Sequence, residues 1–318
     1  MSSDSSVAQK AGVMARADAA EAPLRLAGCG TALVTPFGEN GELDEPALRA
    51  FVDWQISEGV HFLVPCGSTG EAATMSLEEH RRVVEITVEQ ADGRLPIVAG
   101  AGSNDTQKAI ALSKEMKSAG ATHLLHTSPM YNKPPQRGII AHYRAIADAV
   151  NLPIVVYNVP GRTGSNVEAA TTLELAQHEN IVAVKEASGN LAQITEIIRN
   201  RPTGFSVLSG DDPLTVAVMA EGGDGVISVT SNVVPRLVSQ LAECLALGDL
   251  VQARDLSHRL APWTIAAFVE SNPIPSKAAL ALMGKMRNVL RLPLVPLADA
   301  HAAVLRSSLE AVGALAAR

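Results

Sequence analysis

The chain has 318 residues, of which 47% are hydrophobic and 19% are charged, and its formal net charge is −7. These values are ordinary for a globular protein with a sizeable core, and the length suggests one large domain or one domain with a smaller addition. Because phosphate binding needs a clustered basic surface and no Lys/Arg-rich run is present, the composition disfavours a nucleic-acid partner.

Cysteine usage and hydropathy predict a cytoplasmic protein. Cys29, Cys66 and Cys244 are widely spaced and form no CxxC pair, which fits a reducing compartment without a disulfide framework. No apolar stretch approaches the length that spans a bilayer, so no membrane association is expected. Residues 1–23 are small and polar with interspersed charges; they lack the apolar segment of a signal peptide and are interpreted as a disordered tail.

From residue 24 to about residue 248, short apolar runs alternate with longer segments of helical period. Eight runs are predicted strands: Cys29–Val34, His61–Pro65, Ile97–Ala99, His123–His126, Ile154–Tyr157, Ile181–Lys185, Ser206–Leu208 and Gly225–Val229. Predicted helices cover roughly 44–58, 76–91, 104–118, 136–149, 167–178, 190–200 and 212–221. Several helices begin at residues that cap helix N-termini, namely Asp44, Ser76, Asn104, Asn190 and Asp212.

This alternation predicts an α/β fold, a closed (β/α)8 barrel over residues 24–248. The strands lack polar alternation, which is typical of a parallel sheet covered by helices on both faces. Eight βα units in this length favour the barrel, and an open doubly wound sheet, which shares the alternation, is the alternative. Residues 249–318 show helical patterns and proline-rich breaks, and are predicted to be an appended helical segment.

Barrels carry their reactive groups at the C-terminal ends of the strands. There the sequence places "GSTGE" after strand two, "TSPMYNKP" after strand four, "YNVPGRTG" at strand five, Lys185 at strand six, "SGDD" after strand seven and "GVISVT" at strand eight. An apolar environment favours a neutral amine, and a desolvated lysine forms Schiff bases with ketones. The alternative for Lys185 is a lysine that extends from the strand end to solvent; its position at this rim favours the chemical role.

Other residues of the same rim suit acids and proton transfer. Ser68 and Thr69 lie in a glycine-rich turn whose N–H groups and hydroxyls suit a carboxylate or phosphate, although an ordinary βα turn explains the stretch equally well by itself. Tyr131 and Tyr157 fall at strand ends, which favours proton handling over packing; the alternative is a buried tyrosine whose hydroxyl is hydrogen-bonded. Arg162 follows in a loop and could bind a carboxylate through two hydrogen bonds; the alternative is a solvated arginine.

Metal and nucleotide chemistry are disfavoured by the motifs that are missing. His123 and His126 lie three residues apart in a predicted strand, and no HExxH pattern occurs. The stretch "GAGSND" lacks the third glycine of a dinucleotide fingerprint, and no phosphate-loop lysine is present. No metal and no cofactor are therefore expected.

From about Gly30 to Pro296 the sequence resembles the pyruvate-dependent class I aldolases that include dihydrodipicolinate synthase and N-acetylneuraminate lyase. The resemblance depends on "GSTGE", "YNVPGRTG", "VKEASGN", "LSGDD", "GVISVT" and "NPIPSKAAL". It implies a (β/α)8 barrel that uses a covalent lysine–pyruvate imine in place of a cofactor. It also implies a homotetramer built from two tight dimers.

The same resemblance implies a role for each candidate. Lys185 would form the imine, and Tyr157 would transfer protons at the imine and at the new carbon–carbon bond. Ser68 and Thr69 would hold the pyruvate carboxylate, and Thr69 would link Tyr157 to Tyr131 of a neighbouring subunit. Two further residues would line the site, Gly210 and, through its carbonyl, Ile227. Arg162 would bind the carboxylate of the aldehyde.

The arginine of "GRTG" and the "KEASGN" stretch resemble the synthase branch. The implied reaction condenses pyruvate with L-aspartate 4-semialdehyde to 4-hydroxy-tetrahydrodipicolinate, in lysine and diaminopimelate synthesis. One alternative is another aldolase of the branch, acting on a 2-oxo acid or sugar acid such as 2-keto-3-deoxygluconate. The other is a barrel that binds a metabolite without turnover, which the joint presence of Lys185, Tyr157, Thr69 and Arg162 argues against.

One departure from the family pattern predicts an enzyme that lysine does not inhibit. Regulated members carry a glutamate where this chain has Lys108, and a histidine and a tyrosine where it has Leu77 and Met130. Asn104 and His80 are retained. The ammonium of Lys108 would repel the ammonium of a bound lysine.

Overall fold

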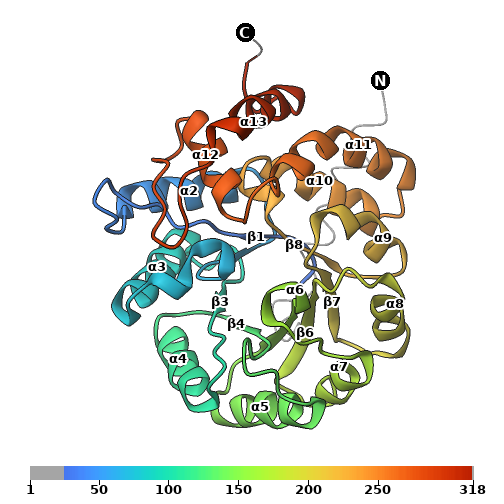
Figure 1. The fold of residues 1–318 in the computed structure, drawn as a ribbon. Helices are drawn as coiled ribbons and strands as arrows, with labels where there is room; N and C mark the ends of the chain where they lie inside the picture. Colours follow the sequence, from blue (N-terminus) through green and yellow to red (C-terminus); the bar gives the residue numbers. More distant parts are fainter. Residues whose placement is uncertain (1–24, 317–318) are drawn as a thin grey trace.

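Eight parallel strands form the centre of the molecule, and a ring of helices surrounds them (Figure 1). The computed structural model describes residues 25–316, so the predicted tail, residues 1–23, lies outside the described residues. The strands are β1 (Gly28–Ala32), β2 (Phe62–Val64), β3 (Val98–Gly100), β4 (His123–Thr127), β5 (Ile154–Asn158), β6 (Ile181–Glu186), β7 (Ser206–Ser209) and β8 (Gly225–Ser228). Each overlaps one of the eight predicted strands.

The sheet closes on itself, which confirms the barrel and rules out the open doubly wound alternative. Its strands are hydrogen-bonded in the order β2-β1-β8-β7-β6-β5-β4-β3. The two ends of this series meet where Leu63 pairs with Ile97 in a parallel bridge. The N–H of Leu63 donates to the carbonyl of Pro96 at 3.0 Å, and the N–H of Gly100 donates to that of Pro65 at 2.9 Å.

Helices alternate with the strands along the chain. The α-helices of the barrel are α2 (Glu45–Ser57), α3 (Leu77–Ala91), α4 (Thr106–Ser118), α5 (Gln136–Ala149), α6 (Pro160–Thr163), α7 (Ala169–Leu175), α8 (Leu191–Asn200), α9 (Thr215–Ala220) and α10 (Pro235–Ala246). Short 3₁₀ turns follow three of the strands: η1 (Ser68–Gly70) and η2 (Ala72–Thr74), η3 (Asp212–Leu214) and η4 (Thr230–Asn232). Each of the seven predicted helical segments contains an observed helix.

The predicted caps are correct at three positions. The side chains of Asp44, Ser76 and Asn190 accept from N–H groups of the first turns of α2, α3 and α8. The prediction was wrong at Asn104, because Asp105 caps α4 instead. It was also wrong at Asp212, whose partly buried carboxylate accepts from Ser228 and the N–H groups of Val229 and Thr230 beyond β8.

Two helices were absent from the prediction. α6 is a single turn inside "VPGRTG", too short to show a period. α10 begins with a proline in its first turn, where a missing N–H costs nothing. Its buried Val238, Leu241 and Leu245 recur at helical spacing, so α10 was detectable and covers the barrel between β8 and β1.

Two separate apolar layers hold the barrel together. One cluster fills the interior and includes Val155, Tyr157 and Ala183, while the other lies between the strands and the helices and includes Val156 and Val184. Because side chains alternate along a strand, every second residue of β5 and β6 points into the barrel. Lys185, two residues after Ala183, therefore points inward.

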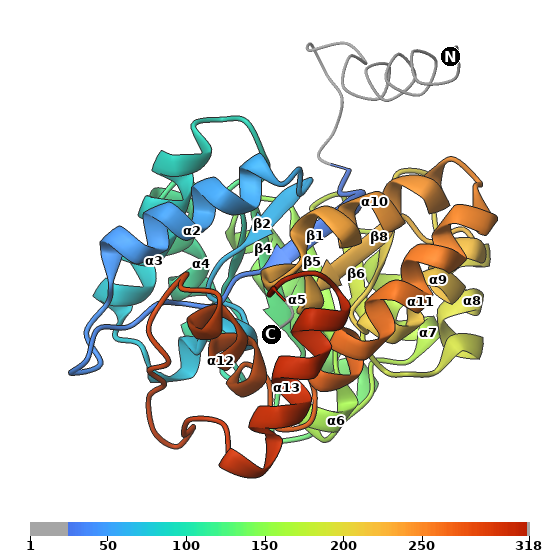
Figure 2. The same ribbon diagram turned by 90° about the horizontal axis from the view of Figure 1, so that it is seen from above.

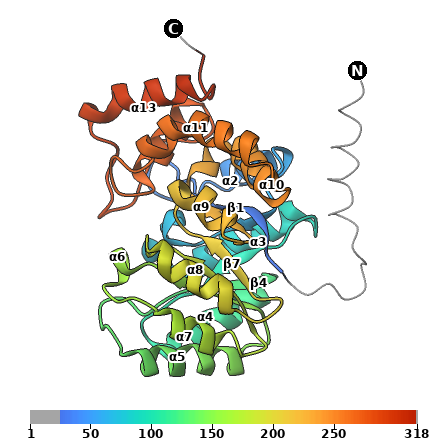
Figure 3. The ribbon, with the colours of Figure 1, turned by 90° about the vertical axis from the view of Figure 1, so that its right-hand side faces the viewer.

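Residues 249–316 contain three further helices and no strand: α11 (Leu250–Ala266), α12 (Ile274–Leu282) and α13 (Asp299–Ala311). They lie together on one side of the barrel, next to α10 (Figures 2 and 3). α12 also approaches η4, which follows β8. This segment therefore reaches the end of the barrel where the strands terminate. Between Arg25 and Ala316, no helix combines the length and the apolar character needed to cross a membrane.

Candidate active site

A cavity of about 80 Å³ lies where the strands end at their carboxyl termini. Six of the eight residues that sequence analysis selected line it: Ser68, Thr69, Tyr157, Arg162, Lys185 and Gly210. They come from the ends of β2, β5, β6 and β7, so the barrel closure unites segments that are far apart in the sequence. Their functional roles remain predictions.

Lys185 lies at the bottom of this cavity beside Tyr157. β5 and β6 pair in parallel with Tyr157 opposite Lys185, and both side chains are buried, with exposed fractions of 7% and 5%. The amine Nζ lies 4.2 Å from the centre of the tyrosine ring. The sheet register thus places a phenol beside a primary amine where neither is much exposed, an arrangement suited to imine chemistry with proton transfer.

Gly210 is required by the space that Lys185 occupies. A Cβ at Gly210 would lie 3.1 Å from Cγ and Cε of Lys185 and 2.7 Å from Cβ of Ala187. The N–H of Gly210 also donates to the carbonyl of Glu186 at 2.7 Å, which holds the backbone close to the end of β6. Any side chain here would displace the lysine.

Ser68 and Thr69 form the 3₁₀ turn η1 at one wall of the cavity. The hydroxyl of Thr69 is buried and accepts a hydrogen bond of 2.8 Å from Nδ2 of Asn272, which precedes α12. In this bond the oxygen of Thr69 is the acceptor, so the hydroxyl proton is free for donation to another oxygen. This orientation is set by a residue 203 positions away.

Arg162 lies on the short helix α6, at the opening of the cavity, and is exposed. Nη2 of its side chain donates a hydrogen bond of 3.3 Å to the backbone carbonyl of Asn272. No carboxylate of the described chain lies within ion-pair distance of it in residues 25–316. The guanidinium is therefore available to an anion that enters the cavity.

Two predicted residues lie elsewhere. Tyr131 is 89% exposed and its backbone is left-handed, with φ of 71°, so within this chain it does not reach Thr69. Ile227 is fully buried in the barrel interior, and Val229, two residues later, contributes to the cavity lining in its place.

Sequence reasoning missed Asp211, Phe268 and Asn272, which also line the cavity. Asp211 stood inside the quoted "SGDD" stretch without being assigned a role. Burial raises the pKa of its carboxyl group, while the nearby Lys185 has the opposite, smaller effect. Phe268 and Asn272 belong to the C-terminal segment, where no strand-end rule could have indicated them.

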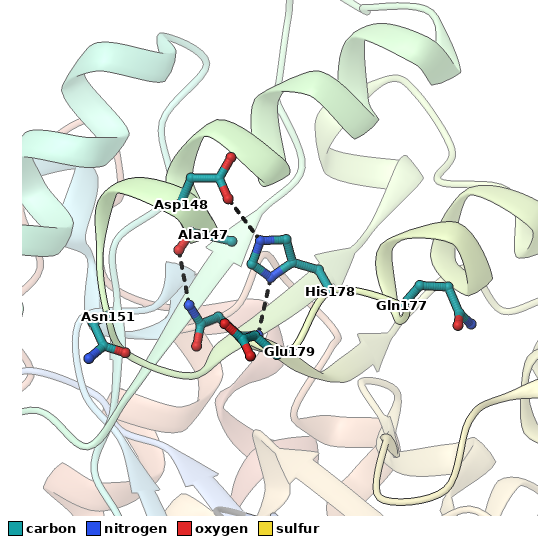
Figure 4. A pocket seen from close by; sticks show the side chains of 7 residues that line it. Ala147, Asp148, Asn151, Gln177, His178 and Glu179 are labelled. Atoms are coloured by element: carbon teal, nitrogen blue, oxygen red, sulfur yellow. Dashed lines mark hydrogen bonds and ion pairs between the residues drawn. The ribbon is translucent and has the colours of Figure 1, made fainter.

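A larger, open depression of about 570 Å³ lies at the other end of the barrel, where α5 leads to β5 and α7 leads to β6 (Figure 4). Both ring nitrogens of His178 are bonded there. Nε2 lies 3.0 Å from Oδ1 of Asp148, and Nδ1 accepts from the N–H of Asn180 at 3.1 Å. No side chain in it resembles a nucleophile, so volume alone does not indicate a site.

Residues 25–316 contain no group of three or more His, Cys, Asp or Glu side chains able to hold a metal ion.

Known proteins resemble the chain over nearly all of the described residues. It is 48% identical over 287 residues to the 4-hydroxy-tetrahydrodipicolinate synthase of Maridesulfovibrio salexigens, covering 90% of this chain and 98% of the relative. The synthase of Nitratidesulfovibrio vulgaris is 49% identical over 293 residues, covering 92% of this chain and all of the relative.

Solved structures agree with the sequence relatives. Dihydrodipicolinate synthase from Thermotoga maritima superposes with a TM-score of 0.90 at 43% identity, covering 92% of this chain and 100% of that one. The pyruvate complex of the Acinetobacter baumannii enzyme gives 0.90 at 41% identity, covering 91% and 99%. Residues 25–312 match the dihydrodipicolinate synthetase family, and the chain belongs to this family.

Proposed function

We propose that this protein is an enzyme that condenses pyruvate with L-aspartate 4-semialdehyde to 4-hydroxy-tetrahydrodipicolinate, a step in lysine and diaminopimelate synthesis. The observation that carries the proposal is the buried amine of Lys185, 4.2 Å from the ring centre of Tyr157 in the cavity at the carboxyl ends of the strands. The names of the relatives and the A. baumannii pyruvate complex support the same substrates.

The chemistry follows from the groups that line the cavity. The amine of Lys185 adds to the ketone carbon of pyruvate, and loss of water gives an imine. Protonation of the imine makes the pyruvate methyl group acidic, so that a proton can leave and an enamine can attack the aldehyde carbon. Tyr157 is the acid–base group in contact with the amine. Lys185 supplies the electrophilic activation that a cofactor supplies elsewhere, so the proposed reaction uses none.

Two anion sites would orient the two substrates. Ser68 and Thr69, in η1, offer hydroxyls and N–H groups to the pyruvate carboxylate. Arg162, at the opening, is without a carboxylate partner among residues 25–316 and suits the carboxylate of the semialdehyde. A sugar-derived aldehyde would present neutral hydroxyl groups to Arg162, and these bind a guanidinium more weakly than a carboxylate does.

Tyr131 would complete the site of a second copy. A large aromatic side chain that is 89% exposed on a left-handed backbone is costly in an isolated chain. Entry into a neighbouring subunit would account for it, and the predicted homotetramer is proposed on this ground. A monomeric variant is known in one solved relative, so assembly in this family is open to change.

Borohydride trapping tests the proposal. Incubation with pyruvate and borohydride should add one reduced pyruvate to the peptide that contains Lys185, as read by mass spectrometry. A coupled assay should then show turnover with L-aspartate 4-semialdehyde and weaker turnover with aldehydes of 2-keto-3-deoxy sugar acids. Trapping without turnover of the semialdehyde would identify another aldolase of the family. Absence of any adduct would contradict the proposal.

A further inference from the structure

Among residues 25–316, one ion pair is buried completely, and its two residues lie close in sequence to Thr69 and Asn272 of the cavity lining. Nζ of Lys277 lies 2.6 Å from Oε1 of Glu71, and both side chains have no exposed surface. Neither residue lines the cavity. Glu71 ends the "GSTGE" stretch of the barrel, and Lys277 lies in "NPIPSK" of the C-terminal segment.

On the barrel side, the pair holds the turn that carries Ser68 and Thr69. Glu71 follows η1 directly, and its N–H donates to the carbonyl of Ser68 at 3.2 Å. Its backbone is left-handed, with φ of 56°, a conformation that side chains other than glycine adopt only at some cost. The carboxylate therefore anchors a turn whose own backbone geometry is unfavourable.

On the other side, the pair holds the residue that orients Thr69. Lys277 lies in the first turns of α12, five residues after Asn272, whose Nδ2 donates to Oγ1 of Thr69 at 2.8 Å. Two cross-links, Thr69 to Asn272 and Glu71 to Lys277, thus join the same two segments of chain. The ion pair therefore holds η1 and the start of α12 at the separation that the bond from Asn272 to Thr69 needs.

Stability alone does not explain a charged pair at this position. Desolvating two charges offsets most of their attraction, and well-packed apolar side chains often serve as well. The pair is also enclosed. The Phe37 ring centre lies 4.2 Å from Nζ of Lys277 and 4.3 Å from the guanidinium carbon of Arg291, and the N–H of Arg291 donates to Oε2 of Glu71 at 3.0 Å. Hydrogen bonds to both oxygens of Glu71 fix the position and the orientation of its carboxylate, whereas apolar contacts have no preferred direction.

We propose that the Glu71–Lys277 ion pair is a positioning device for the pyruvate-carboxylate turn: it sets Ser68 and Thr69 against Asn272 and so acts on pyruvate binding. The inference rests on the proposed function, because it assumes that Ser68 and Thr69 hold pyruvate. Glu71 and Lys277 act through η1 and α12 and touch no substrate.

The test replaces the pair by neutral side chains of similar size, Glu71→Gln with Lys277→Met. The glutamine can still accept from the Arg291 N–H, and the methionine can pack against Phe37. The pyruvate concentration that gives half-maximal borohydride trapping should rise about 10-fold or more, because small displacements of binding groups are costly. The KM for the semialdehyde should change much less.

A control uses a partly buried ion pair at the opposite end of the barrel, Arg201→Met with Asp224→Asn; Arg25 also pairs with Asp224. Asp224 pairs with Arg201 and also accepts from a backbone N–H, that of Val207 at 2.8 Å. This control should lower Tm and leave the pyruvate concentration for half-maximal trapping within about twofold of that of the unmodified protein. Equal loss of pyruvate binding in both variants would overturn the inference, as would unchanged binding in a folded Glu71→Gln/Lys277→Met variant.

If that double variant does not fold, Glu71→Asp decides, since it keeps both charges but shortens the link between η1 and α12 by one methylene group, which draws the carboxylate away from Nζ of Lys277. Weaker pyruvate trapping in this variant supports the inference, and unchanged trapping overturns it. Failure of the proposed function is separate from these outcomes, because the unmodified protein would then form no pyruvate adduct at all.

Discussion

The two ends of the barrel differ in how their polar groups are satisfied. At the amino-terminal ends of the strands the depression is large, but His178 is bonded through both nitrogens, and Asp224 is held between Arg25 and Arg201. At the carboxyl ends the cavity is small, yet it gathers Lys185, Tyr157 and Arg162 with donors and charges left available. Unused bonding capacity in a confined space, rather than volume, marks the reactive end.

The strongest test of this difference removes the amine. Lys185→Ala should abolish both the borohydride-trapped pyruvate adduct and turnover to background, because the nucleophile is gone. Lys114→Ala, which removes an exposed lysine of α4, is the control and should retain both. A full-strength adduct in Lys185→Ala would show that another amine reacts.

Arg162→Ala should act on the second substrate. Loss of a charge-assisted contact to a carboxylate costs about 1.5–3 kcal/mol, which corresponds to a KM for the semialdehyde roughly 10- to 150-fold higher. Pyruvate trapping should be largely retained. Arg144→Ala, at a surface ion pair with Glu174, serves as the control in steady-state kinetics. Equal damage to pyruvate trapping would mean that Arg162 organises the whole rim through Asn272.

Gly210→Ala should slow imine formation without removing any reactive group. The added methyl group would lie 2.7 Å from Cβ of Ala187 and 3.1 Å from Cγ and Cε of Lys185, so the end of β6 and the lysine must both shift. We expect the rate of pyruvate trapping to fall by about tenfold, since small misplacements of a nucleophile are costly. Gly161→Ala, where a Cβ meets nothing within 4 Å, is the steric control. An unchanged trapping rate would show that the pocket has spare room.

His178→Ala should change stability and leave kinetics intact. Two hydrogen bonds at the amino-terminal end would be lost, each worth on the order of 1 kcal/mol. Urea unfolding should therefore show a lower free energy of unfolding, while KM and kcat match those of the unmodified protein. A kinetic effect would show that this end communicates with the cavity.

The smallest expected effect is that of lysine on the rate. Lys108 lies exposed in the first turn of α4, Leu77 is 49% exposed, and Nε2 of His80 lies 2.8 Å from the carbonyl of Gly100. A second ammonium beside Lys108 would be repelled, and joint desolvation of two like charges is costly. Titration of lysine into the steady-state assay should leave the rate unchanged. Lysine binding does occur in the family, because the enzyme of Cyanidioschyzon merolae was solved with lysine bound. Half-inhibition of this protein at sub-millimolar lysine would contradict the prediction.

The sequence by itself predicted the barrel and the position of Lys185 at the carboxyl end of a strand, because these depend on local signals. Short unbroken apolar runs, capped helical segments and a lysine at a strand end are readable one segment at a time. The prediction of a helix cap failed where two neighbouring residues were both suited to capping. Asn104 and Asp105 are both residue types that cap helices; Asp105 accepts from the first turn of α4, while the side chain of Asn104 donates to the carbonyl of Met130.

Only the tertiary structure decided which distant groups meet. Strand register placed Tyr157 against Lys185, close packing made Gly210 necessary, and the C-terminal helices brought Asn272 to Thr69 and Lys277 to Glu71. The last two contacts span 203 and 206 residues, and no periodicity links their partners. They depend on barrel closure and helix packing, which are properties of the whole chain; Tyr131, by contrast, is 89% exposed and does not line the cavity.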